Sequence, residues 1–111
     1  MINTEQANMD LPLAIERNTK WHYDKDIIEN GIEASQLEKL KEECFEVIEA
    51  FTYGCSDEAC KKEVGDVVTV LNNLCERRRY TLQECLELTN EKLSKRTGKK
   101  VNGTFVKSED L

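Results

Sequence analysis

Apolar residues recur every three or four positions in three long segments of the chain, and this spacing is the period of an amphipathic α-helix. Proline occurs once, at Pro12, and glycine only five times, so few residues interrupt such helices. The apolar stripes consist of Leu37, Leu40, Cys44, Val47, Ile48 and Phe51; of Val64, Val67, Val68, Leu71, Leu74 and Cys75; and of Leu82, Cys85, Leu86, Thr89 and Leu93.

Capping signals divide these stripes into separate helices. The segments 35–38 (Ser-Gln-Leu-Glu) and 81–84 (Thr-Leu-Gln-Glu) both read as capping boxes, in which the hydroxyl and the glutamate each bind a free backbone amide. Gly54 predicts a left-handed end for the first striped helix, and Ser56 can begin the next. Asp10 and Pro12 predict an earlier helix over residues 11–22.

These signals predict a single all-α domain over residues 1–111, built as a small four-helix bundle. Residues 1–9 carry no pattern and are expected to form a loose N-terminal arm. Residues 99–111 are expected to form a short extended tail around an Asn102-Gly103 turn. Four short helices give a thin core, so a homo-oligomer is expected.

Composition excludes several functional classes. No apolar run approaches the roughly 20 residues needed to cross a bilayer, and no secretory signal pattern opens the chain. A net charge of −6 argues against duplex nucleic acid as a partner. The five cysteines lack the spacing of a zinc site or a disulfide framework, which indicates reduced thiols in a cytoplasmic protein.

Two pairs of acidic residues lie three positions apart on neighbouring helices. These pairs are Glu43 with Glu46, and Glu63 with Asp66. Acidic residues are common enough here that such pairs also arise by chance, but both border the apolar stripe of their helix instead of lying opposite it. If the two helices pack together, the four carboxylates converge on one groove.

Converging carboxylates must take up protons or hold a cation, because two of them about 4 Å apart repel by roughly 4 kcal/mol at a dielectric near 20. An all-oxygen site suits Mg²⁺, with Mn²⁺ as a second possibility. A di-iron bundle would place histidines three residues after glutamates, and the single histidine, His22, does not lie so. Gly65, between Glu63 and Asp66, is either a point of close approach or a tolerated small residue.

Other candidate ligand-binding residues have ordinary structural alternatives. Lys92 and Arg96 flank the last apolar stripe, where they can hold a phosphate chain or cover the edge of the core. Asn73 follows Asp66 by two helical turns and is either a nucleotide contact or a polar surface residue. Trp21 either stacks on a base or closes the core.

Combined, these residues resemble the all-α nucleoside triphosphate pyrophosphohydrolases, the MazG-like family. The likeness covers about residues 11–107. It comprises Glu-Glu-x-x-Glu at 42–46, Glu-x-x-Asp at 63–66, Asn73, and Asn-x-Lys-Leu-x-x-Arg at 90–96, where Leu93 replaces an aromatic residue. The Trp-His pair at 21–22 resembles the end of the first helix in small bacterial and phage members, and the tail resembles those of phage-borne members.

This resemblance implies Mg²⁺-dependent cleavage of a nucleoside triphosphate between its α- and β-phosphates, in a bacterium or phage-infected cell, by a homodimer or homotetramer. It assigns metal binding to Glu43, Glu46, Glu63 and Asp66, and activation of water to Glu42 or Glu46. The resemblance further assigns phosphate or nucleoside binding to Lys92, Arg96, Asn73, Trp21 and His22. The alternative reading is a non-catalytic helical module that binds a nucleotide or a protein.

Overall fold

The computed structural model describes residues 10–111, so the expected loose arm at residues 1–9 lies outside the described residues. Four helices and a terminal hairpin follow one another, which confirms the all-α prediction. The elements are α2 (Leu11–Asp24), α3 (Glu33–Tyr53), α4 (Asp57–Arg77), α5 (Leu82–Ser94), β1 (Gly98–Val101), β2 (Thr104–Lys107) and the short 3-10 helix η1 (Ser108–Asp110).

Side-chain caps begin three of the four helices. Asp10 accepts a hydrogen bond from the Leu13 amide at 2.7 Å, and Ser56 accepts one from Ala59 at 3.2 Å. Thr81 and Glu84 form the predicted capping box. The other predicted box is wrong, because α3 begins two residues before Ser35 with Ile32 at the cap position. Ser35 therefore lies inside the first turn, where its amide already bonds to the Ile32 carbonyl.

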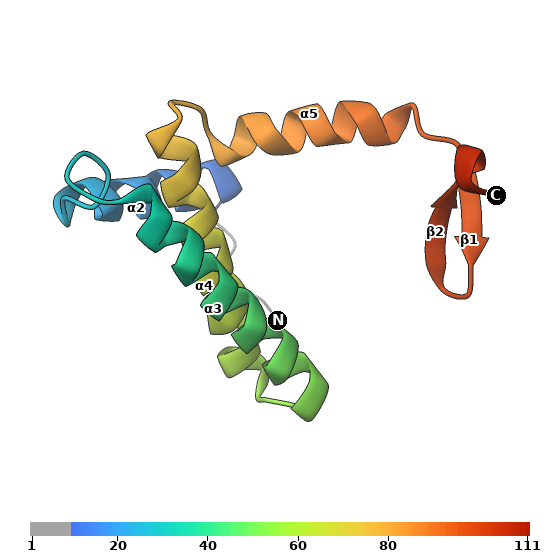
Figure 1. Ribbon diagram of the computed structural model, residues 1–111, viewed down its shortest axis with the longest axis horizontal. Coiled ribbons are helices and arrows are strands. Elements are labelled where there is room, and N and C mark those ends of the chain that lie inside the picture. The colour runs from blue at the N-terminus through green and yellow to red at the C-terminus, as the bar shows by residue number, and fades with distance from the viewer. Residues whose placement is uncertain (1–9) are drawn as a thin grey trace.

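Helices α3 and α4 form an antiparallel pair, as their short connection predicts (Figure 1). Gly54 ends α3 with a φ of +92°, a backbone conformation that glycine adopts without strain. The following turn carries a disulfide between Cys55 and Cys60, which corrects the expectation of reduced thiols at these positions. Their Cα atoms are 5.8 Å apart, within the bonding range, because the helix start folds residue 60 back toward residue 55.

Helix α2 lies against the later turns of α4, and together α2, α3 and α4 form what we call the helical body. Its interior is unusually polar. Within residues 10–111 the buried apolar side chains are Val70 and Cys75 alone, and the largest fully buried side chains are His22, Asn72 and Asn73. Hydrogen bonds, more than apolar packing, therefore fix how α2 meets α4.

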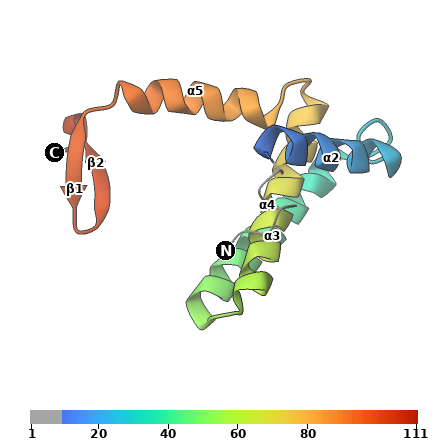
Figure 2. The same cartoon turned by 180° about the vertical axis from the view of Figure 1, so that it is seen from behind.

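Helix α5 and the hairpin leave the helical body as an extended arm, and the view from behind shows the same separation (Figures 1 and 2). We call residues 82–111 the arm. No residue of α5 is buried, and the apolar Leu86, Leu88 and Leu93 are 49%, 69% and 47% exposed. The radius of gyration is 16.9 Å, against about 13 Å for a compact domain of similar length. The single chain thus contains the four predicted helices without closing them into a bundle.

The tail forms a two-stranded antiparallel hairpin, with Gly98 opposite Lys107 and Val101 opposite Thr104. Asn102 and Gly103 have φ values of +51° and +81°, which confirms the predicted Asn-Gly turn. Helix α5 ends at Ser94, four residues before Gly98 pairs in β1. Arg96 therefore lies in the link between helix and hairpin. No helix among residues 10–111 is long and apolar enough to cross a membrane.

Candidate functional site

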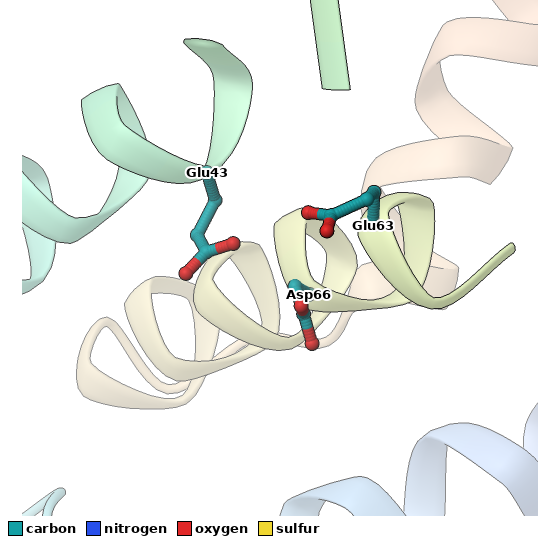
Figure 3. Close-up of side chains that lie close together, drawn as sticks. All are labelled: Glu43, Glu63 and Asp66. Atoms are coloured by element: carbon teal, nitrogen blue, oxygen red, sulfur yellow. The ribbon is translucent and has the colours of Figure 1, made fainter. Parts of the chain in front are cut away.

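Three carboxylates meet where α3 and α4 run side by side. Glu43 comes from α3, and Glu63 and Asp66 come from successive turns of α4 (Figure 3). One oxygen of each lies within 4.8 Å of an oxygen of the other two. We call Glu43, Glu63 and Asp66 the acidic cluster. Their convergence follows from the position of both acidic pairs at the edge of the apolar stripes.

Burial makes this cluster electrostatically unfavourable by itself. Glu43 is only 6% exposed, and Oε2 of both Glu43 and Glu63 is buried without a hydrogen-bond partner among residues 10–111. The nearest cation is Lys39, one turn earlier on α3, whose Nζ lies 3.1 Å from Oε1 of Glu43. One ammonium group cannot neutralise three carboxylates, so the cluster needs additional positive charge or protons.

Glu46 lies beside the acidic cluster, and its pKa reflects the negative charge of the cluster. In its protonated form its carboxyl donates a hydrogen bond to Glu43, and this bond, with the negative charges of Glu43 and Glu63, raises the pKa of Glu46. Glu42, by contrast, is exposed and lies 3.7 Å from Nζ of Lys39. The two candidates for water activation thus differ. Glu46 borders the acidic cluster directly, whereas Glu42 pairs with Lys39, the lysine that also pairs with Glu43.

The chemistry of this donor set fits a hard divalent cation. All potential ligand atoms are carboxylate oxygens, which Mg²⁺ and Mn²⁺ prefer. The two unpartnered oxygens would gain a partner, and the repulsion that raises the pKa of Glu46 would be offset. We therefore regard the acidic cluster with Glu46 as a candidate metal centre.

His22 and Asn73, both predicted to contact substrate, lie inside the helical body, 1% and 0% exposed. Asn73 Nδ2 donates to Nδ1 of His22 at 3.2 Å and to the Ile27 carbonyl at 3.3 Å, and Asn73 Oδ1 accepts from Nε of Arg77 at 2.7 Å. Nε2 of His22 lies 2.9 Å from the Thr69 carbonyl, which can only accept, so this nitrogen carries the proton. Their polar atoms are occupied within the chain.

Burial also sets the charge of His22. Loss of hydration lowers the pKa of its imidazole, the Thr69 carbonyl raises it less, and the nearby Arg77 charge lowers it further. The ring is consequently neutral at pH 7. Neutral His22 serves as a fixed hydrogen-bond donor and acceptor between α2 and α4.

The remaining candidates lie on the surface. Trp21 is 47% exposed and packs edge-on against the His22 ring, with centroids 5.0 Å apart. Lys92 is exposed near the end of α5, and Arg96 is partly covered just beyond it. Both belong to the arm, which points away from α3 and α4 (Figure 1). The structure therefore brings the acidic residues together and leaves the two cations apart from them.

Sequence reasoning missed the polar network around Asn72. Asn72 Nδ2 donates to Asn18 Oδ1 and Thr19 Oγ1, each at 3.0 Å, and Asn18 donates to Thr69 at 3.0 Å. One signal was available for Asn72, which lies four residues after Val68 and therefore beside the apolar stripe. Lys39, too, was missed, although it lies four residues before Glu43, the spacing of a helical ion pair.

Comparison with known proteins yields one match. The family model described as "MazG nucleotide pyrophosphohydrolase domain" matches residues 33–101, which run from the start of α3 to the end of β1. The matched region contains the entire acidic cluster, Glu46, Lys92 and Arg96, but not α2. A search of curated proteins and a search of solved structures returned no significant match.

Proposed function

The chain belongs to the MazG nucleotide pyrophosphohydrolase family, and from this premise we propose that it cleaves a nucleoside triphosphate between the α- and β-phosphates. The products are a nucleoside monophosphate and pyrophosphate. The observation that supports this most strongly is the acidic cluster, in which two buried carboxylate oxygens have no hydrogen-bond partner in the described part of the chain. A triphosphate is itself an anion, so such a cluster can receive it only through bound cations.

In this proposal Glu43, Glu46, Glu63 and Asp66 hold Mg²⁺ or Mn²⁺. A divalent ion held by these residues would supply Lewis-acid chemistry, offsetting the negative charge of the phosphates and lowering the pKa of a water. Glu46 is the better placed of the two candidate bases, because it borders the acidic cluster, whereas Glu42 is exposed and pairs with Lys39. Glu42 contributes by holding Lys39 near Glu43.

Substrate binding is divided between the helical body and the arm. Lys92 and Arg96 bind the phosphates, and the half-exposed Trp21 is available to stack on a base. His22 and Asn73 act indirectly, by holding α2 against α4 through their buried hydrogen bonds. This differs from the direct contacts that the family resemblance implies for those two residues.

The proposed enzyme is a homo-oligomer, a dimer or a tetramer. Large apolar side chains line the open faces of α3 and α4, including Phe45, Ile48 and Phe51, which are 62–65% exposed. Exposed apolar area of this extent on adjacent helices is typical of an interface between chains.

The first test is pyrophosphate release from a panel of canonical and modified nucleoside triphosphates with Mg²⁺. The wild-type protein should release pyrophosphate from at least one of them, and Glu63→Gln should reduce the rate about a hundredfold or more. Glu58→Gln is the matched control, because Glu58 lies on the same helix but is exposed and pairs with Lys62. It should retain wild-type activity.

Absence of release from every nucleotide would contradict the enzymatic function. Nucleotide binding that survives both EDTA and Glu63→Gln would instead favour the non-catalytic module.

A further inference from the structure

Two free thiols meet at the junction between the helical body and the arm. Cys75 lies in the last turn of α4 and Cys85 in the first turn of α5, and their Sγ atoms are 3.8 Å apart. We call Cys75 and Cys85 the junction thiols. Few other contacts join α5 to α4 (Figure 1). A covalent bond between these sulfurs would therefore tie the arm directly to the body.

The backbone between the two helices holds the junction thiols close together. The Tyr80 amide donates to the Cys75 carbonyl at 3.2 Å, and Arg79 just before it adopts a φ of +64°. The Cys85 amide donates to the Thr81 carbonyl at 3.2 Å, as part of the first turn of α5. These bonds reverse the chain within a short link, so the two sulfurs meet although ten residues separate them in sequence.

The distance between the junction thiols is close to what a disulfide requires. An S–S bond is about 2.0 Å long, so the two sulfurs need to approach by less than about 2 Å. Rotations of the two cysteine side chains can supply a shift of this size. The third free thiol, Cys44 on α3, makes no comparable contact with another sulfur in the described part of the chain.

A cavity of about 620 Å³ gives a small molecule access to one of the two sulfurs. We call it the junction cavity. Its lining consists of Cys85, two large side chains and three carboxylates: Tyr80, Leu88, Glu84, Glu87 and Glu91. Cys75 does not line this cavity and is only 8% exposed. A reagent that enters the junction cavity therefore meets Cys85 first.

Burial also distinguishes the two thiols chemically. Loss of hydration, and next the hydrogen bond to Cys85, raise the pKa of Cys75 to about 11, with a smaller contribution from Glu76. Cys75 is thus a thiol at pH 7 and donates its S–H to Cys85. A sulfur of high pKa is a poor leaving group, so we expect a disulfide formed here to resist reduction by small thiols.

The reagent that suits the junction cavity is a small disulfide with positive charge. Of the three carboxylates in the lining, Glu91 alone forms an ion pair within residues 10–111, with Lys95 at 3.3 Å. The cavity therefore keeps a net negative charge beside Cys85. Such a cavity attracts cations and repels anions, so a disulfide that carries ammonium groups should enter more readily than one that carries carboxylates.

We propose that the junction thiols are a modification site, at which a small cationic disulfide oxidises Cys75 and Cys85 to an intrachain disulfide that fixes α5 to α4. Sγ of Cys85, as a thiolate, attacks one sulfur of the reagent and breaks its S–S bond, and the half that leaves takes up the proton from Cys85. Sγ of Cys75 then loses its proton and attacks Sγ of Cys85, and the second half leaves as a thiol with that proton. Two electrons pass from the protein to the reagent. This proposal does not depend on the proposed pyrophosphohydrolase function.

Peptide mapping of the full-length protein tests the bond directly. After reaction with cystamine and blocking of the remaining thiols, tryptic digestion without reduction should yield residues 63–77 linked to residues 80–92. The linked species should be about 2 Da lighter than the two free peptides together, because two hydrogens are lost. Cys75 and Cys85 are the only cysteines of these peptides, and the other three cysteines all fall within residues 42–61. Absence of the linked species would overturn the proposal.

Single variants test the roles of the two sulfurs. In Cys75→Ala the reaction should stop at Cys85, which keeps half of the reagent attached. In Cys85→Ala the buried Cys75 should react at least about tenfold more slowly than Cys85 does in Cys75→Ala. Comparable rates would overturn the role of Cys85 as the attacking sulfur. Cys44→Ser is the matched control and should form the linked peptides at the wild-type rate.

The wild-type peptide map decides the proposal even if either alanine variant fails to fold, because it requires no substitution.

Reaction rates test the charge of the junction cavity. With each rate divided by that of the same reagent with free cysteine, cystamine should react about tenfold faster than dithiodiglycolate, an anionic disulfide, at low ionic strength. Glu87→Gln should reduce this ratio about twofold, because it removes one of the three carboxylates. Glu58→Gln, exposed in the first turn of α4, is the matched control and should leave the ratio unchanged. Equal rates for the two reagents would overturn the choice of a cationic disulfide.

Discussion

The helical body and the arm are stabilised in different ways. In the body, buried hydrogen bonds from His22, Asn72 and Asn73 connect α2 to α4 across about fifty residues of sequence. In the arm, the Thr81 capping box and the Asn102-Gly103 turn act within a few residues, and no α5 side chain is buried. Local signals are thus sufficient to form the elements of the arm, whereas its direction is set by the few contacts between α5 and α4.

The largest expected effect concerns the buried network of the body. Asn73→Ala should lower the free energy of unfolding by about 3 kcal/mol, because it leaves buried groups on His22 and Arg77 without partners. Asn90→Ala is the control in the arm and should change the free energy of unfolding by less than about 0.5 kcal/mol, since Asn90 is exposed. Urea denaturation at one protein concentration measures both. Similar losses for both variants would remove the distinction between body and arm.

A smaller effect, of opposite sign, is expected at Gly65. A methyl group there would meet no atom of the chain within 4 Å. Gly65→Ala should therefore stabilise α4 and raise the free energy of unfolding by about 0.8 kcal/mol, as measured by urea denaturation. A decrease would show that another surface covers this part of α4, so that the body would depend on contacts beyond the single chain.

The smallest expected effect is a pH dependence from His22. Burial lowers the pKa of His22 in the folded chain, so below about pH 6.5 the unfolded chain takes up a proton that the folded chain does not. The stabilisation that this lowered pKa contributes is fully present above about pH 6.5, and it is lost as the pH falls toward the pKa of His22 in the folded chain. Between pH 7 and 5.5 the denaturation midpoint should fall more for the wild-type protein than for His22→Gln. Equal slopes would contradict a neutral, buried imidazole.

Periodicity and caps predicted most of the local structure. The start of α4, the start of α5 and the hairpin turn follow from Ser56, Thr81 and Asn102-Gly103, because each acts on a backbone group within three residues. The start of α3 was missed at Ser35, where the backbone continued the helix two residues further back. The Cys55–Cys60 pairing also escaped prediction, since it depends on how tightly the turn folds.

The acidic cluster could also be predicted from the sequence. Both acidic pairs lie at the edge of an apolar helical stripe, and the two helices that carry them are joined by a short turn. The roles of Asn73 and His22 could not be predicted, because helical phase does not reveal which turns of α4 a third helix covers. Asp66 and Asn73 lie two turns apart, yet α2 buries only Asn73. The direction of α5 could not be predicted from the sequence either, because no other helix among residues 10–111 covers its exposed apolar stripe.

Lys39 gives the candidate metal centre a tethered counterion. Its ammonium group lies 3.1 Å from a buried oxygen of Glu43, and this hydrogen bond raises the pKa of Lys39, so the lysine stays charged at any physiological pH. Lys39 supplies only part of the positive charge that the acidic cluster needs, and a divalent ion that bound Glu43 would compete with this ammonium group for the same carboxylate.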